Sequence, residues 1–204
     1  MATVLLVRHG ETTWNRDGLI QGWAPSQLTA RGHEQARTLA AYLVTAYDVD
    51  RVVSSDLLRA QETTASLVAA LPSSVPTPRF DAAWRERDFG FLQGLTDETV
   101  RRRFPEYALD VVGYTAATER PKGGESFLDL RERVLAAWRA LLDGAAAHET
   151  VLVVTHGGPI RFVLADLKGL DVVDAILGQK QDNCALNEIR IAETPELVRE
   201  NETR

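Results

Sequence analysis

Cysteine and long apolar runs are almost absent from the 204-residue sequence. The single cysteine, Cys184, cannot form an internal disulfide, so no disulfide framework is expected. Apolar runs such as residues 4–7 are a few residues long, whereas a membrane-spanning helix needs about 20. Residues 1–7 also lack the basic start and cleavage site of a signal peptide. These absences predict a cytoplasmic protein that does not enter a membrane.

Basic residues are also fewer than acidic ones. The chain has 29 acidic and 23 basic residues, and its formal net charge is −6. This balance argues against a general nucleic-acid-binding protein, because affinity for the phosphate backbone comes from a basic surface. Only three of the basic residues are lysines, at 122, 168 and 180. Arginine binds phosphate bidentately, although genome composition is the more ordinary source of this bias.

The composition is typical of a globular protein, with 45% hydrophobic and 25% charged residues. At about 150 residues per domain, and with no repeat or linker, the chain predicts one domain over residues 1–204. Strands are predicted at residues 4–7, 52–53, 151–154 and 184–191. Helices are predicted at 28–44, 57–71, 126–142 and 157–167, with Thr29 and Ser126 as caps. This alternation indicates an α/β fold with a mainly parallel sheet.

Two of the predicted strands lead directly into histidines. Arg8 and His9 follow the first strand, His156 follows the strand at 151–154, and the strand at 52–53 leads to Arg59. Ligands of such sheets bind at the carboxyl ends of the strands. If these strands are neighbours in the sheet, the four side chains are expected at one rim.

A neutral imidazole beside guanidinium groups suits phosphoryl transfer. Arg8 and Arg59 would bind phosphate oxygens, with each charge-assisted hydrogen bond contributing about 1.5–3 kcal/mol. Their charges would lower the pKa of His9 and keep it nucleophilic. The helix start at residues 157–159 would direct free N–H groups at the anion.

Other interpretations of these residues remain open. The two histidines could bind a metal together with Glu11 or Asp56, although neighbouring arginines would repel a cation, or they could be ordinary core residues. Cys184 and Arg190 have the spacing of cysteine-dependent phosphatases. Their segment lacks the glycines that curl a loop around phosphate, so we discount this match.

The segment Arg8-His9-Gly10-Glu11-Thr12, followed by Trp14 and Asn15, resembles the signature of the histidine phosphatase superfamily, the phosphoglycerate mutase-like fold. Further segments are similar to the family's motifs and occur in its order: 21–32, 54–63, 85–90, 123–126 and 155–158. The loop at residues 24–28 departs from the family's usual pattern, which leaves the contacts to substrate open. The resemblance implies a three-layer αβα sandwich with a mostly parallel central sheet.

The resemblance also implies a role for each matched residue. His9 would be the nucleophile that becomes phosphohistidine, and Arg8, Arg59 and His156 would complete the phosphate pocket. Glu86 would protonate the leaving oxygen and then activate water. A second set of matched positions would bind phosphate or line the pocket: Asn15, Gln21, Gly22 and Gly157. The family's chemistry needs neither a metal nor a cofactor.

These expectations favour a phosphatase that hydrolyses small phosphorylated metabolites as a monomer or homodimer. A cofactor-dependent phosphoglycerate mutase is the alternative, but mutases carry a longer segment than the residues 87–122 that separate Glu86 from Gly123. A catalytically idle interaction protein is a third possibility, disfavoured because all the expected site residues are present. The residues that select the substrate are expected in segments 24–27 and 91–121.

Overall fold

A six-stranded sheet forms the centre of the computed structural model, which describes residues 1–204. Its strand order is β3-β2-β4-β1-β5-β6. The strands are β1 (Ala2–Arg8), β2 (Arg51–Ser54), β3 (Arg79–Phe80), β4 (Thr150–Thr155), β5 (Leu186–Ile191) and β6 (Glu196–Glu202). Only β5 runs against the other strands, so the sheet is mostly parallel, as expected.

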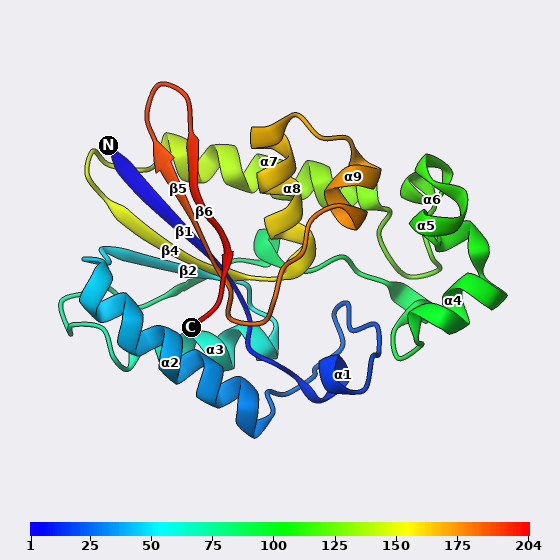
Figure 1. The fold of residues 1–204 in the computed structure, drawn as a ribbon, viewed down its shortest axis with the longest axis horizontal. Helices are drawn as coiled ribbons and strands as arrows, with labels where there is room; N and C mark the ends of the chain where they lie inside the picture. The colour runs from blue at the N-terminus through cyan, green and yellow to red at the C-terminus, as the bar shows by residue number, and fades with distance from the viewer.

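The longer helices cover both faces of this sheet (Figure 1). They are α2 (Ala30–Ala46) and α3 (Leu58–Val68) on one face, and α7 (Phe127–Asp143) and α8 (Gly157–Lys168) on the other. Leu5 and Val7 of β1 pack with the core under α2 and α3, whereas Val4 and Leu6 pack with the core under α7 and α8. Because successive strand residues face opposite sides, the continuous apolar run of β1 fills both cores. The three-layer αβα sandwich is confirmed.

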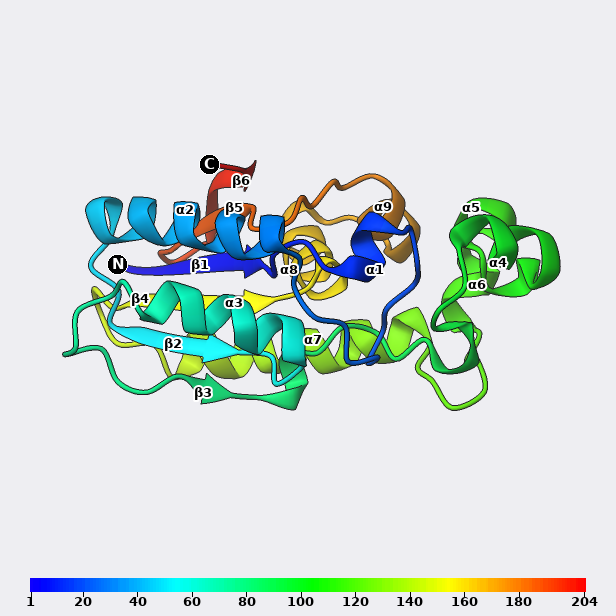
Figure 2. The ribbon, with the colours of Figure 1, turned by 90° about the horizontal axis from the view of Figure 1, so that it is seen from below.

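The short helices lie mainly in the connections. They are α1 (Thr13–Arg16), η1 (Ala82–Trp84), η2 (Gly90–Leu92), α4 (Asp97–Arg103), η3 (Pro105–Tyr107), α5 (Leu109–Val112), α6 (Tyr114–Thr118) and α9 (Val172–Leu177). Both ribbon views place α4, α5 and α6 beyond the carboxyl ends of β1, β2 and β4 (Figures 1 and 2). None of the helices combines the length and apolar character needed to cross a membrane.

The helix starts follow the capping signals of the sequence. Thr29 accepts a hydrogen bond from Gly32 N at the start of α2, and Ser126 and Asp129 form the predicted capping box of α7. The predicted helix over residues 57–71 is too long, because α3 ends at Val68.

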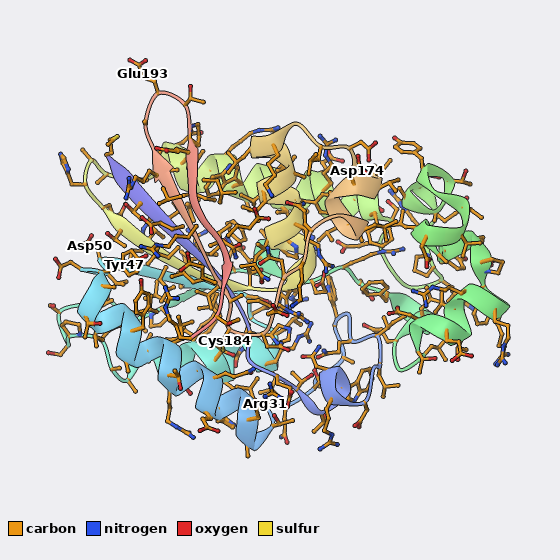
Figure 3. All side chains as sticks on the ribbon, in the orientation of Figure 1. Arg31, Tyr47, Asp50, Asp174, Cys184 and Glu193 are labelled. Atoms are coloured by element: carbon orange, nitrogen blue, oxygen red, sulfur yellow. The ribbon has the colours of Figure 1, made fainter.

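The end of the chain differs from the predicted single strand over residues 184–191. Cys184 has a φ of 54°, outside strand geometry, and β5 begins only at Leu186. A hairpin with Glu193 at its tip then leads into β6 (Figure 3). The sequence pattern misses β6 because this edge strand is charged and half exposed, without the apolar alternation of a buried strand.

Candidate active site

The structure brings together the four residues that the strand ends predict. Arg8 is the last residue of β1, His9 follows it, His156 follows β4, and Arg59 lies in the first turn of α3. Strands β1, β4 and β2 are neighbours in the sheet, so their carboxyl ends meet. The rings of His9 and His156 have centroids 5.2 Å apart. A cavity of about 270 Å³ opens here, lined by Arg8, His9, Asn15, Gln21, Gly22, Arg59 and Glu86 among others.

His9 is held so that Nε2 presents its lone pair. The ring is buried, and its Nδ1 lies 2.8 Å from the carbonyl oxygen of Gly10. Because a carbonyl oxygen only accepts hydrogen bonds, Nδ1 must carry the proton and donate it. Nε2 therefore accepts in the neutral ring, and it receives a hydrogen bond from Arg59 Nε at 3.2 Å. Burial, followed by the charges of Arg59 and Arg8, holds the pKa of His9 well below 6.5. The expected cause, the arginine charges, is present but secondary to burial.

Close backbone packing fixes the loop that carries His9. A Cβ on Gly10 would lie 2.6 Å from the carbonyl oxygen of Gly32, and one on Gly32 would lie 2.1 Å from that of Glu11. Neither glycine can gain a side chain without moving backbone. The loop after β1 is therefore locked against the first turn of α2.

Arg59 has hydrogen-bond partners but no carboxylate in contact. It is buried and donates to the carbonyl oxygens of Gly22 at 2.7 Å and Ala24 at 3.3 Å. Burial lowers its pKa to about 10. Arg8 donates Nη1 to the carbonyl oxygen of Gln181, while its buried Nε has no partner. Two guanidinium groups without carboxylate contacts form a site prepared for an anion.

His156 extends the same arrangement. Its Nε2 lies 2.8 Å from Ser55 Oγ, and its buried Nδ1 has no hydrogen-bond partner. Burial and the charge of Arg59 hold its pKa well below 6.5. Ser55, absent from the predicted site, orients this ring from the loop after β2.

Glu86 faces this cluster from the loop after η1. Its Oε1 accepts from Arg87 N at 2.8 Å, and its Oε2 accepts from Gly158 N at 3.0 Å. The prediction that α8 directs free N–H groups at an anion is therefore wrong for Gly158, because Glu86 occupies that donor. Pro159 has no N–H, so Gly157 alone of the expected group has its N–H available.

Arg133 of α7 holds the loop that carries Glu86, and sequence reasoning missed it. Its guanidinium donates to the carbonyl oxygens of Ala83 at 3.1 Å, Arg85 at 3.0 Å and Glu86 at 3.2 Å. The same group pairs with Glu125 at 2.7 Å. The sequence held one signal for the ion pair: Arg133 lies two helical turns after Glu125, the residue just before the capping box.

The remaining predicted residues border the cavity. Asn15 Oδ1 accepts from Thr12 N and from Asn183 Nδ2, each at 3.2 Å, while its Nδ2 has no protein acceptor. Gln21 Oε1 accepts from the hydroxyl of Thr12 at 2.9 Å. Gly22 takes part through its carbonyl oxygen, which accepts from Arg59. The role of Asn183 in holding Asn15 was not foreseen.

The alternative metal site has no geometric support. No group of three or more histidine, cysteine or acidic side chains is placed to hold a metal ion. Glu11 accepts from the hydroxyl of Thr29 at 2.8 Å, and Asp56 pairs with Arg85. Both acidic candidates are therefore engaged elsewhere.

The cysteine match is equally without support. Cys184 is buried, and burial raises the pKa of its thiol to about 12, so it is not a thiolate near neutral pH. Arg190 pairs with Glu188 on β5. Neither residue lines the cavity that holds His9.

The family pattern of the histidine phosphatase superfamily (branch 1) matches residues 4–203. The chain belongs to this superfamily. The chain is 37% identical over 172 residues to a 2,3-bisphosphoglycerate-dependent phosphoglycerate mutase of Methylobacterium radiotolerans, covering 82% of this chain and 79% of the relative. The protein is thus an enzyme that acts on phosphate esters.

Solved structures resemble this chain from end to end. Bacillus stearothermophilus YhfR matches it with a TM-score of 0.88 and 26% identity, covering 100% of this chain and 98% of that one. Mycobacterial glucosyl-3-phosphoglycerate phosphatase, in a complex with VO3, matches with a TM-score of 0.83 and 27% identity, covering 98% and 99%. The relatives' names thus divide between mutase and phosphatase.

Proposed function

We propose that this protein hydrolyses small phosphomonoester metabolites without a metal, through a phosphohistidine on His9. The observation that carries the proposal is the neutral His9 Nε2 beside the guanidinium groups of Arg8 and Arg59, neither of which touches a carboxylate. Phosphoryl transfer depends mainly on positioning and charge stabilisation, and this arrangement supplies both.

The reaction then takes two steps. In the first, His9 Nε2 forms a bond to phosphorus, the bond to the leaving oxygen breaks, and Glu86 gives that oxygen its proton. In the second, Glu86 takes a proton from water, the water oxygen bonds to phosphorus, and the bond to His9 breaks. Arg59 Nε, which donates to His9 Nε2, would turn to a phosphate oxygen when the substrate binds. Backbone donors from Arg87 and Gly158 keep the Glu86 carboxyl group in place throughout.

A solved phosphatase of the same fold supports hydrolysis over isomerisation. The match to the mycobacterial phosphatase covers 98% of this chain and 99% of that one. Mutase activity is the second candidate, favoured by the identity to mutase sequences.

Phosphate release from a panel of phosphorylated metabolites tests the proposal, with EDTA present and a His9→Ala control. We expect release in EDTA, none from the control, and an acid-labile phosphohistidine in the wild-type enzyme only. Isomerisation of 3-phosphoglycerate to 2-phosphoglycerate without release would establish the mutase instead. Failure to transfer phosphate from any compound would indicate that this chain is a catalytically idle interaction protein.

A further inference from the structure

A second cavity, of about 280 Å³, adjoins the phosphate site. Its lining is mostly apolar and comes largely from the segments around α4, α5 and α9, including Leu92, Val100, Leu109, Phe127 and Ile176. The two cavities share Ile20, Glu86, Phe89 and Asp97. Glu86 therefore lies on their boundary. In the proposed reaction Glu86 serves the leaving oxygen, so the body of the leaving group would occupy this second cavity.

The second cavity contains one guanidinium group without an acidic partner. Arg161 of α8 donates Nε to the carbonyl oxygen of Gln179 at 2.8 Å, and Gln179 Nε2 donates back to the carbonyl oxygen of Arg161 at 2.9 Å. Its two terminal nitrogens have no protein acceptor, and no carboxylate pairs with it. Arg101, which lines the same cavity, is by contrast exposed and paired with Asp110.

Arg161 also lies close to the reacting centre. A Cβ on Gly157 would be 3.8 Å from Arg161 Nη1, 3.8 Å from Arg8 Nε and 4.0 Å from Glu86 Oε2. These three groups thus surround the first residue of α8. A small leaving group attached to the phosphate would extend past Glu86 and reach Arg161 within a few bonds.

We propose that Arg161 binds a carboxylate on the leaving group, so that the enzyme prefers carboxylate-bearing phosphomonoesters. The inference rests on the phosphatase function proposed above. A guanidinium anchored through Nε presents its two free nitrogens as a planar fork, which matches a carboxylate. The apolar walls strengthen the ion pair by lowering the local dielectric. A second phosphate group fits less well, because it would bring additional negative charge near Glu86 and Asp97.

Matched substrate pairs test this inference. O-phosphoserine and O-phosphoethanolamine differ by one carboxylate, and 3-phosphoglycerate carries a carboxylate where glycerol 3-phosphate carries a hydroxymethyl group. We expect the wild-type enzyme to prefer the carboxylate member of each pair by roughly 10–100-fold in kcat/KM, the range of a charge-assisted contact. Arg161→Gln should bring this preference close to one, and Arg161→Lys should retain part of it. Arg101→Gln is the matched control and should keep the wild-type preference.

Three results would overturn the inference. The wild-type enzyme could show no preference for carboxylates, or Arg161→Gln could keep the preference. Arg161→Gln could also lower the activity on every substrate equally and weaken inhibition by inorganic phosphate, which would assign Arg161 to the transferred phosphate. The proposed function fails separately, if the wild-type enzyme releases phosphate from no substrate at all.

Discussion

The backbone nitrogen of Gly158 donates to Oε2 of Glu86 at 3.0 Å. Glu86 comes from the loop after η1 and Gly158 from the first turn of α8, so this bond joins the acid to the helix whose N-cap is His156. Glu86 and His156 are therefore both held by the start of α8. The Glu86 carboxyl group can lie this close to α8 only because residue 158 has no side chain.

Replacing Gly158 with alanine should displace the acid. The new Cβ would lie 2.2 Å from Glu86 Oε1 and 2.9 Å from Leu130 Cδ2, so the carboxyl group has to move. We expect kcat on alkyl phosphates to fall about 100-fold, within the range of a lost general acid. Steady-state kinetics measure the loss. Gly144→Ala, at the end of α7 and away from the site, is the control, and equal activity of the two variants would contradict the prediction.

Arg133→Gln should loosen the loop that carries Glu86. The variant removes donors to three backbone carbonyl oxygens and the ion pair with Glu125. We expect a loss of about 1–3 kcal/mol in the free energy of unfolding, measured by urea denaturation. We also expect kcat to fall at least about tenfold on alkyl phosphates, with KM changing less, because the general acid is misplaced.

A leaving-group comparison separates this positioning role from simple destabilisation. p-Nitrophenyl phosphate has a leaving group that needs little protonation, so its turnover by Arg133→Gln should fall much less than that of an alkyl phosphate. Arg131→Gln, an exposed neighbour on α7, serves as the matched control for stability and rate. Equal losses on both substrate types would argue against a role in positioning Glu86.

Stability should fall on mild acidification. Burial holds the pKa values of His9 and His156 well below 6.5, so below pH 6.5 the unfolded chain takes up protons that the folded chain does not. The contribution of these two rings is thus fully present above pH 6.5 and is lost as the pH falls toward their lowered pKa values. Two protons correspond to a slope of up to about 2.7 kcal/mol per pH unit.

Urea unfolding between pH 7.5 and 5.5 measures this slope. A variant with His9→Gln and His156→Gln should be much less dependent on pH in this interval. His148→Gln, which changes an exposed histidine, should keep the wild-type slope. A wild-type slope that the double variant retains in full would show that other groups cause it.

Several elements follow from short-range signals. The buried runs of β1 and β4, and the caps Thr29 and Ser126, depend on neighbours a few residues away and are visible in the sequence. The charged edge strand β6 gives no such signal, because its place depends on pairing with β5 rather than on burial. The prediction for α3 is too long for a similar reason: the end of a helix depends on the packing around it, which the local sequence does not show.

Local patterns were enough to place Arg8, His9, Arg59 and His156 at or shortly after the ends of buried strands, because a strand's burial shows in a few consecutive residues. Folding alone brings those strands side by side and sets the partners that these and the other site residues meet. The bond between Gly158 and Glu86, the hold of Arg133 on the acid loop and the unpaired guanidinium of Arg161 in the second cavity arise between segments far apart in the chain. Such contacts depend on how helices and loops pack onto the sheet, and no local pattern specifies that packing.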